Sequence, residues 1–319
     1  MKEVLVISTG GTIASKENES GRLEAGAYSG EELAEKIGLP STIKVTIRSV
    51  LQKPSSHITF HDLDDIRTII EESESKISGF VITHGTDTLE ESAYYLDITT
   101  EESRPVVLTG SQRSPDDLGS DAFINLRHAI HAAASADMHE TGVTVVFNER
   151  IFAARYVKKE HASNIQGFNA FGFGYLGIID HDQVQVFQKP VRHETFQVSE
   201  KQVQVELIKS AMQSSTLLID ACNNNEVDGL IVEGYGRGQV DPALVDGIKE
   251  ALSNQIPVVI TTSSEEGAVY PVYDYQGSAY HLFAEGALLG GDYDAKKARI
   301  RLICALRSGS PLHSLYKGD

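Results

Sequence analysis

The feature of this sequence that most restricts its fold is a repeated order of short apolar runs, polar loops and helical stretches. In the first half, each β-branched run precedes a loop rich in Gly and hydroxyl residues and then apolar residues spaced about 3.6 positions apart. Thr59 and Asp62 fit a capping pattern at the start of one helical stretch. Because continuous apolar runs are typical of strands buried on both faces, the order predicts a doubly wound α/β sheet. The three clearest runs and their loops are Val4 to Ile7 with Thr9 to Ile13, Phe80 to Thr83 with His84 to Thr88, and Val106 to Thr109 with Gly110 to Ser120.

From about Val143 the pattern changes to short strands with turn signals, which predicts hairpins around residues 148–150 and 180–183. After a polar stretch, the strand and helix order restarts at Thr216 to Asp220 and ends in a helix from about Asp294 to Arg307. At about 150 residues per domain, 319 residues suffice for two domains. We expect a larger N-terminal domain with a hairpin extension of its sheet, a linker, and a smaller C-terminal domain with a parallel sheet. Their expected ranges are 1–190, 191–214 and 215–319.

Composition narrows the class of partner. The chain has 28 Lys and Arg against 45 Asp and Glu, and this net charge of −17 argues against binding to nucleic acid or an anionic membrane. Cys222 and Cys304 lie in apolar surroundings, which is typical of buried thiols. The N-terminal apolar run is too short for a signal peptide, and no stretch approaches the roughly 18 apolar residues of a membrane span. We expect a cytoplasmic protein with a small-molecule partner.

The loops after the three clearest strands are the candidate site, because ligands of open α/β sheets bind beyond the carboxyl ends of the strands. The first loop has two glycines followed by Thr12, but it lacks the Gly-x-Gly-x-x-Gly spacing of a dinucleotide site. Taken alone, Thr12 fits a turn hydroxyl bonded to its own backbone better than a nucleophile. In the second loop, Thr86 and Asp87 fit helix capping as well as catalysis. His84 fits a structural imidazole better than a base.

Standard hydrolase signatures are absent from the sequence. There is no Gly-x-Ser-x-Gly elbow, no His-Glu-x-x-His zinc helix and no phosphate loop. Two threonines at neighbouring strand ends, one carboxylate, and Lys158 and Lys159 remain as chemical groups. A threonine nucleophile needs a base, and a partly desolvated lysine oriented by a carboxylate can serve. Because no residues show metal-ligand spacing, we expect neither a metal nor a cofactor.

Two loops together resemble the signature segments of the bacterial-type L-asparaginases. Each follows a predicted strand, as the family requires, and the similarity extends over nearly the whole chain. The short N-terminus is similar to the cytosolic branch of the family. The resemblance implies two α/β domains, with the site shared between the N-terminal domain of one subunit and the C-terminal domain of another in a homodimer or homotetramer. The similar segments are Thr9 to Ala14, Thr83 to Ala93, Arg104 to Arg113, Asp121 with Asn125 and Leu126, and Lys297 to Ile300 with Leu302.

The resemblance also implies a reaction, which is hydrolysis of the side-chain amide of L-asparagine to L-aspartate and ammonia. Thr12 would be the nucleophile that forms an acyl-enzyme. Thr86, Asp87 and Lys159 would form a second group that activates the attacking group and moves protons. Lys159 is preferred to Lys158 because it lies four residues after an arginine, as in the family's pattern.

Substrate binding is implied by the same resemblance. A pair of serines would bind the α-carboxylate, Asp87 would meet the α-ammonium, and main chain in the third loop would bind the side-chain amide. Backbone amides in the first two loops could stabilise the oxyanion. A lid between Ser15 and Ser29 would supply a tyrosine and exclude water. The residues assigned to these roles are Ser55, Ser56, Asp87, Ser111, Gly11, Gly85 and Tyr28.

Two other functions stay open at this stage. The tRNA-dependent amidotransferase subunit shares both threonine loops but normally carries an extra N-terminal domain, for which we expect no room before the first loop. A non-catalytic amino-acid sensor would not need a nucleophile and a base together. Preference for asparagine over glutamine also stays open, because Arg237 stands where some members carry an Asn that reaches a neighbour's site.

Overall fold

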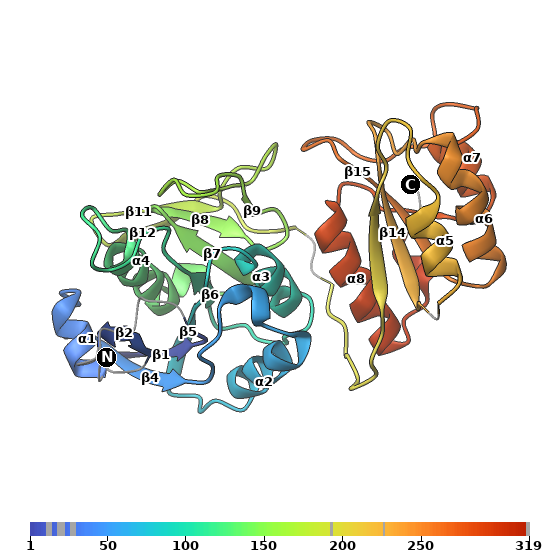
Figure 1. Ribbon diagram of the computed structural model, residues 1–319. Coiled ribbons are helices and arrows are strands. Elements are labelled where there is room, and N and C mark those ends of the chain that lie inside the picture. Colours follow the sequence, from blue (N-terminus) through green and yellow to red (C-terminus); the bar gives the residue numbers. More distant parts are fainter. Residues whose placement is uncertain (11–14, 18–22, 26–29, 192–193, 226, 317–319) are drawn as a thin grey trace. The chain divides into compact units, whose positions relative to one another are not determined.

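The computed structural model describes residues 1–10, 15–17, 23–25, 30–191, 194–225 and 227–316, with the backbone alone at 15–17, 23–25 and 30. The chain divides into two compact units, Met1–Thr195 and Phe196–Asp319, and Figure 1 draws both. Each unit is an α/β fold with its own sheet and core, which confirms the predicted fold class. The functional division into residues 1–190 and 215–319 stays a prediction.

The described part of the N-terminal unit contains an eight-stranded mixed sheet. Across the sheet, the strands are β12 (Gln183–Val186), β11 (Gly177–Asp180), β8 (Arg150–Ala153), β7 (Val143–Phe147), β6 (Val106–Thr109), β5 (Ile77–Thr83), β1 (Lys2–Ser8) and β4 (Ile43–Ser49). The five strands from β7 to β4 are parallel, and the other three add antiparallel hairpins. Their tight turns have positive φ at 148–149 and 181–182, where both hairpins are predicted.

Helices cover both faces of the parallel strands. They are α1 (Gly30–Lys36), α2 (Phe60–Glu71), α3 (Leu89–Asp97) and α4 (Ala122–Ala134). Figure 1 shows α1 and α4 on one side of the sheet and α2 and α3 on the other. The described unit also contains the 3₁₀ helices η1 (Ser55–His57) and η2 (Ala136–Met138) and two small ribbons. The first pairs β2 (Ser15–Glu17) with β3 (Leu23–Ala25), and the second pairs β9 (Lys158–Lys159) with β10 (Phe168–Asn169).

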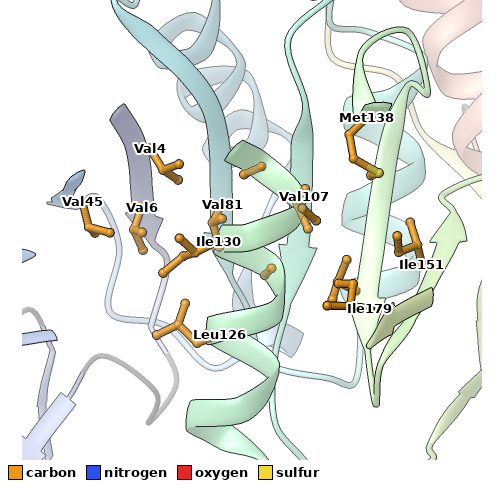
Figure 2. Packing of buried hydrophobic residues seen from close by; sticks show 14 of the residues in the cluster. Val4, Val6, Val45, Val81, Val107, Leu126, Ile130, Met138, Ile151 and Ile179 are labelled. Carbon is orange, nitrogen blue, oxygen red and sulfur yellow. The ribbon is translucent and has the colours of Figure 1, made fainter. Parts of the chain in front are cut away.

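The core between the sheet and α4 is built from alternate strand residues. Val6 and Val81 face Leu126 and Ile130 of α4 in one buried cluster, which Figure 2 shows. Alternation in a strand sends the intervening residues to the opposite face, where helices also pack. Burial of each such side chain stabilises the fold by about 1.5–3 kcal/mol. The sheet therefore aligns the carboxyl ends of β1, β5 and β6 beside one another.

The C-terminal unit contains a parallel sheet in the order β13 (Val205–Lys209), β14 (Gly229–Gly234), β15 (Val258–Thr262) and β16 (Leu288–Leu289). Figure 1 shows α8 (Ala295–Ser308) on one side of this sheet and α5 (Leu217–Asn223) with α6 (Val245–Ser253) on the other. α8 agrees with the helix predicted at the end of the chain. The described elements that complete the unit are α7 (Ala279–Ala284), α9 (Leu312–Leu315) and the 3₁₀ helix η3 (Pro242–Leu244).

The start of the C-terminal sheet differs from the sequence prediction. The strand predicted at Thr216 to Asp220 is wrong, because this stretch belongs to α5, where Leu217 and Leu218 are 71% and 60% exposed. The first strand is β13, inside the stretch expected as the linker. β13 lies at an edge of the sheet and places Glu206 and Lys209 next to its buried residues, Val205 and Ile208, so its sequence resembles a polar linker.

Candidate active site

Three strand ends bring the predicted loops together. The Thr9 backbone N–H and hydroxyl both donate to the Thr83 carbonyl, at 3.3 and 2.9 Å. The His84 N–H in turn donates to the Thr109 carbonyl at 2.9 Å. The loops after β1, β5 and β6 are thus joined at one edge of the sheet, which is the predicted position of the site.

Lys159 joins the second loop through its ammonium group. Its Nζ donates to Thr86 Oγ1 at 2.9 Å and to Asp87 Oδ1 at 2.7 Å. The lysine side chain is 15% exposed, whereas the Asp87 side chain is 75% exposed. The structure therefore brings together three residues that the sequence assigns to one group, and it leaves the carboxylate accessible to a ligand.

A buried carboxylate fixes the backbone of this lysine. Glu90 is 3% exposed, and it accepts a hydrogen bond from the Lys159 backbone N–H. Sequence reasoning did not assign Glu90 to the site. Its position on the first turn of α3, directly after the second loop, was the available signal.

The segment from Lys53 to Ser56, called the serine segment here, lies against the second loop. Thr88 Oγ1 donates to the Ser55 carbonyl at 2.8 Å, and a Cβ on Gly85 would lie 2.9 Å from Ser55 Oγ. Only glycine allows this approach without displacement of the serine. Ser55 is buried, and its neighbour Ser56 is exposed. The two serines thus differ in their access to solvent.

The first loop also contacts the serine segment. The Lys53 N–H donates to the Thr9 carbonyl at 3.1 Å. Gly10 has φ of +119°, and a Cβ there would lie 2.5 Å from the Lys53 carbonyl oxygen. A side chain at Gly10 would be strained in φ and would strike main chain. This glycine therefore lets the first loop and the serine segment approach.

His84 is a buried structural imidazole, in agreement with the sequence interpretation. Burial lowers its pKa to about 4 despite a hydrogen bond to the Gly85 carbonyl. Because a carbonyl only accepts, Nδ1 carries the proton and donates to the Gly85 oxygen at 2.7 Å. Nε2 is buried without a hydrogen-bond partner among the described residues. Near neutral pH the ring is uncharged and supports the turn before Thr86.

The third loop lies beside the second and is held by α4. The backbone N–H groups of Gln112 and Arg113 donate to the Asp121 carboxylate, and Asn125 Nδ2 donates to the Gly110 carbonyl at 3.0 Å. Ser111, half-buried, follows this tethered glycine. A Cβ on Gly110 would lie 3.3 Å from Thr86 Cγ2, so the third loop adjoins the catalytic candidates.

Three assigned residues, Gly11, Thr12 and Tyr28, lie outside the residues that the structure describes. Within the described ranges, no three His, Cys, Asp or Glu side chains form a group suited to a metal ion. No helix in those ranges is long and apolar enough to cross a membrane.

The geometry defines a class of site. A hydroxyl, an ammonium and a carboxylate lie within hydrogen-bond distance at the carboxyl edge of a parallel sheet, which suits reactions that move protons to and from an attacked carbonyl group. Residues 3–192 match the family model of the N-terminal asparaginase domain. Residues 204–316 match the model of the glutaminase/asparaginase C-terminal domain. The chain belongs to the asparaginase family.

Individual relatives cover almost the whole chain. The L-asparaginase of Bacillus licheniformis is 51% identical over 309 residues, which are 96% of each chain. A probable L-asparaginase of Deinococcus radiodurans is 31% identical over 97% of this chain and 94% of its own. The crystal structure of a probable cytoplasmic L-asparaginase from Campylobacter jejuni superposes with a TM-score of 0.85 at 26% identity, covering 99% of this chain and 98% of that one.

Proposed function

We propose that this protein hydrolyses the side-chain amide of L-asparagine to L-aspartate and ammonia through a threonine acyl-enzyme. The observation that carries the proposal is the position of Lys159 Nζ, 2.9 Å from Thr86 Oγ1 and 2.7 Å from Asp87 Oδ1. A sensor would need the charges but not a hydroxyl in contact with a potential base. Similarity to named L-asparaginases over nearly the full chain supports the same substrate.

The reaction divides into two steps. The Thr12 oxygen attacks the amide carbon, and the carbon–nitrogen bond breaks as the nitrogen gains a proton and leaves as ammonia. Water then attacks the Thr12 ester, the acid product leaves, and the threonine hydroxyl regains its proton. In its amine form, Lys159 accepts a proton by way of Thr86, and Asp87 stabilises the resulting ammonium.

Binding residues surround these groups. Ser55 and Ser56 bind the α-carboxylate, and the exposed oxygens of Asp87 meet the α-ammonium. Main chain at Ser111 binds the side-chain amide. Fixing both charges of the amino acid before attack places the amide carbon in reach of the nucleophile. The oxyanion donors assigned here are backbone amides near Gly11 and Gly85, and the lid residue is Tyr28.

The proposed enzyme is a cytoplasmic homo-oligomer. Residues 1–190 supply the catalytic groups, and residues 215–319 complete the site of a neighbouring subunit in a homodimer or homotetramer. Family membership of both regions supports this arrangement. The protein acts in the cytoplasm, as the name of the Campylobacter jejuni relative indicates for that protein.

The test is ammonia release from L-asparagine, L-glutamine and D-asparagine by the full chain. We expect turnover of L-asparagine to exceed that of the other two amides. Thr12→Ala and Thr86→Ala should each abolish release while circular dichroism shows an unchanged fold. Near wild-type turnover by either variant would refute the mechanism, and no release from L-asparagine by the wild type would refute the substrate.

A further inference from the structure

The side-chain amide of Gln112 contacts the same Thr86 hydroxyl that Lys159 contacts. Thr86 Oγ1 and Gln112 Oε1 lie 3.3 Å apart, and Gln112 Nε2 lies 3.4 Å from the His161 carbonyl oxygen. We propose that Gln112 is a positioning residue that holds the Thr86 hydroxyl with its oxygen toward Lys159. This inference rests on the proposed amide hydrolysis.

The donors and acceptors leave one arrangement of protons. A threonine hydroxyl has a single hydrogen, and the Lys159 ammonium donates into its oxygen at 2.9 Å. While Lys159 is an ammonium, the Thr86 hydrogen therefore points to Gln112 Oε1, and it turns to the lysine when Lys159 is in the amine form of the proposed reaction. The amide of Gln112 cannot be reversed, because the His161 carbonyl accepts only and must face the –NH₂ group.

The loop that anchors Gln112 also continues from the strand that carries Lys159. β9 ends at Lys159, and the next two backbone N–H groups, of Glu160 and His161, donate to the Gly167 carbonyl at 2.9 and 3.3 Å. His161 thus presents its own carbonyl to Gln112 from a closed turn. One side chain, Gln112, connects the orientation of the Thr86 hydroxyl with the placement of the lysine.

Gly167 makes room for this connection. A Cβ at Gly167 would lie 1.9 Å from Gln112 Nε2 and 2.9 Å from the Asn164 carbonyl oxygen. The glutamine amide therefore occupies the space that any side chain at this position would need. The backbone of Gln112 is held separately, since its N–H donates to the Asp121 carboxylate at 3.0 and 3.2 Å. A change of its side chain should leave the third loop in place.

The experiment measures steady-state ammonia release from L-asparagine by the full-length protein and its variants. Gln112→Met keeps the side-chain length and removes both polar contacts. We expect kcat to decrease about tenfold, the equivalent of one hydrogen bond, while KM changes less than about twofold. Gln166→Met is the matched control, because this exposed glutamine lies in the turn between His161 and Gly167, where its backbone N–H donates to Asn164 Oδ1. Its kcat should equal that of the wild type.

A second variant tests whether the lower kcat comes from loss of the Gln112 amide contacts. Gly167→Ala keeps Gln112 but displaces its amide and presses on the Asn164 carbonyl, so its kcat should also decrease, and the double variant with Gln112→Met should lose less than the two single losses combined. Wild-type kcat in Gln112→Met would overturn the inference. So would a rise in KM and a lower melting temperature at unchanged kcat, which would show a purely structural role. An inactive wild type would instead refute the proposed function, and this inference with it.

Discussion

Lys158 and Lys159 occupy successive positions of β9, so their side chains leave the strand on opposite sides. The side chain of Lys159 is directed to the second loop, where its ammonium contacts both Thr86 and Asp87. Lys158 and Lys159 therefore lie in different surroundings, although they are adjacent in sequence. The hydrogen bond from the Lys159 backbone to buried Glu90 holds this orientation.

Substitution of each lysine in turn should show that only Lys159 is needed for activity. Lys159→Met removes the proton acceptor, so we expect the rate of ammonia release to fall by roughly 10²–10⁴-fold. Lys158→Met is the matched control and should retain activity within about threefold. Steady-state assays with L-asparagine measure both variants at equal folded concentration. Equal losses in the two variants would contradict the assignment of Lys159.

His84 should make the stability of the protein depend on pH. The unfolded chain binds a proton at this side chain near its ordinary pKa of 6.5, whereas the folded protein binds it only near 4. The unfolded state therefore holds more protons between these values, and acidification through this window lowers the free energy of unfolding. A depression of this size corresponds to roughly 3 kcal/mol at pH 4.

The variant His84→Asn isolates this contribution, because Asn can still donate to the Gly85 carbonyl but does not titrate. The wild type should be the more stable at pH 7, and the gap in unfolding free energy should narrow at pH 4.5 by about 2–3 kcal/mol. Urea denaturation at both pH values measures the gap. A gap that is equal at the two pH values would show that His84 is not buried in its neutral form.

At the scale of elements, the start of α2 fixes the segment that precedes Ser55. Asp62 accepts from the Thr59 N–H at 2.8 Å while the Thr59 hydroxyl accepts from the Asp62 N–H at 3.2 Å, which is the predicted capping pattern. The same carboxylate binds Lys53 Nζ at 2.8 Å. Burial acts to raise the pKa of Asp62, but Lys53 and Thr59 together lower it below its ordinary value.

Removal of the cap should destabilise the protein. Thr59→Ala leaves the first turn of α2 without its acceptor and should lower the free energy of unfolding by about 1 kcal/mol, whereas Thr59→Ser should retain most of it. Thr68→Ala is the matched control on the same helix, because Thr68 is exposed and lies within the helix, where Ala is favoured. Chemical denaturation measures all three. Equal effects at the two threonines would contradict a capping role.

Whether a strand could be predicted from the sequence depended on how continuous its run of apolar residues is. β5 and β6 are recognisable because strands buried on both faces need uninterrupted apolar residues. β13 has only two buried residues, Val205 and Ile208, and its polar residues Glu206 and Lys209 make it resemble the polar stretch that precedes it. In α5 the opposite happens: its apolar run predicts a buried strand, but the run forms a helix in which two leucines are exposed.

At the scale of the whole molecule, the proposed reaction depends on assembly. If the C-terminal domain of one subunit completes the site of another, light scattering at assay concentration should give two or four times the mass of a single chain. Dilution that releases monomers should lower the activity per chain, because each site loses its second half. A fully active monomer would contradict the shared site.

The sequence by itself determined the α/β class and the family, and it predicted the loops that carry the candidate site. These depend on local patterns, namely continuous apolar runs and motifs that follow directly from strand ends. The tertiary structure decided which side chains meet. Lys159 and Thr86 are 73 residues apart, so their grouping came from the family resemblance and not from spacing, and the contact between Thr86 and Gln112, 26 residues apart, was not predicted at all. The contacts of Glu90 with Lys159 and of Gln112 with Thr86 became visible only in the folded structure, because hydrogen bonds form between neighbours in space.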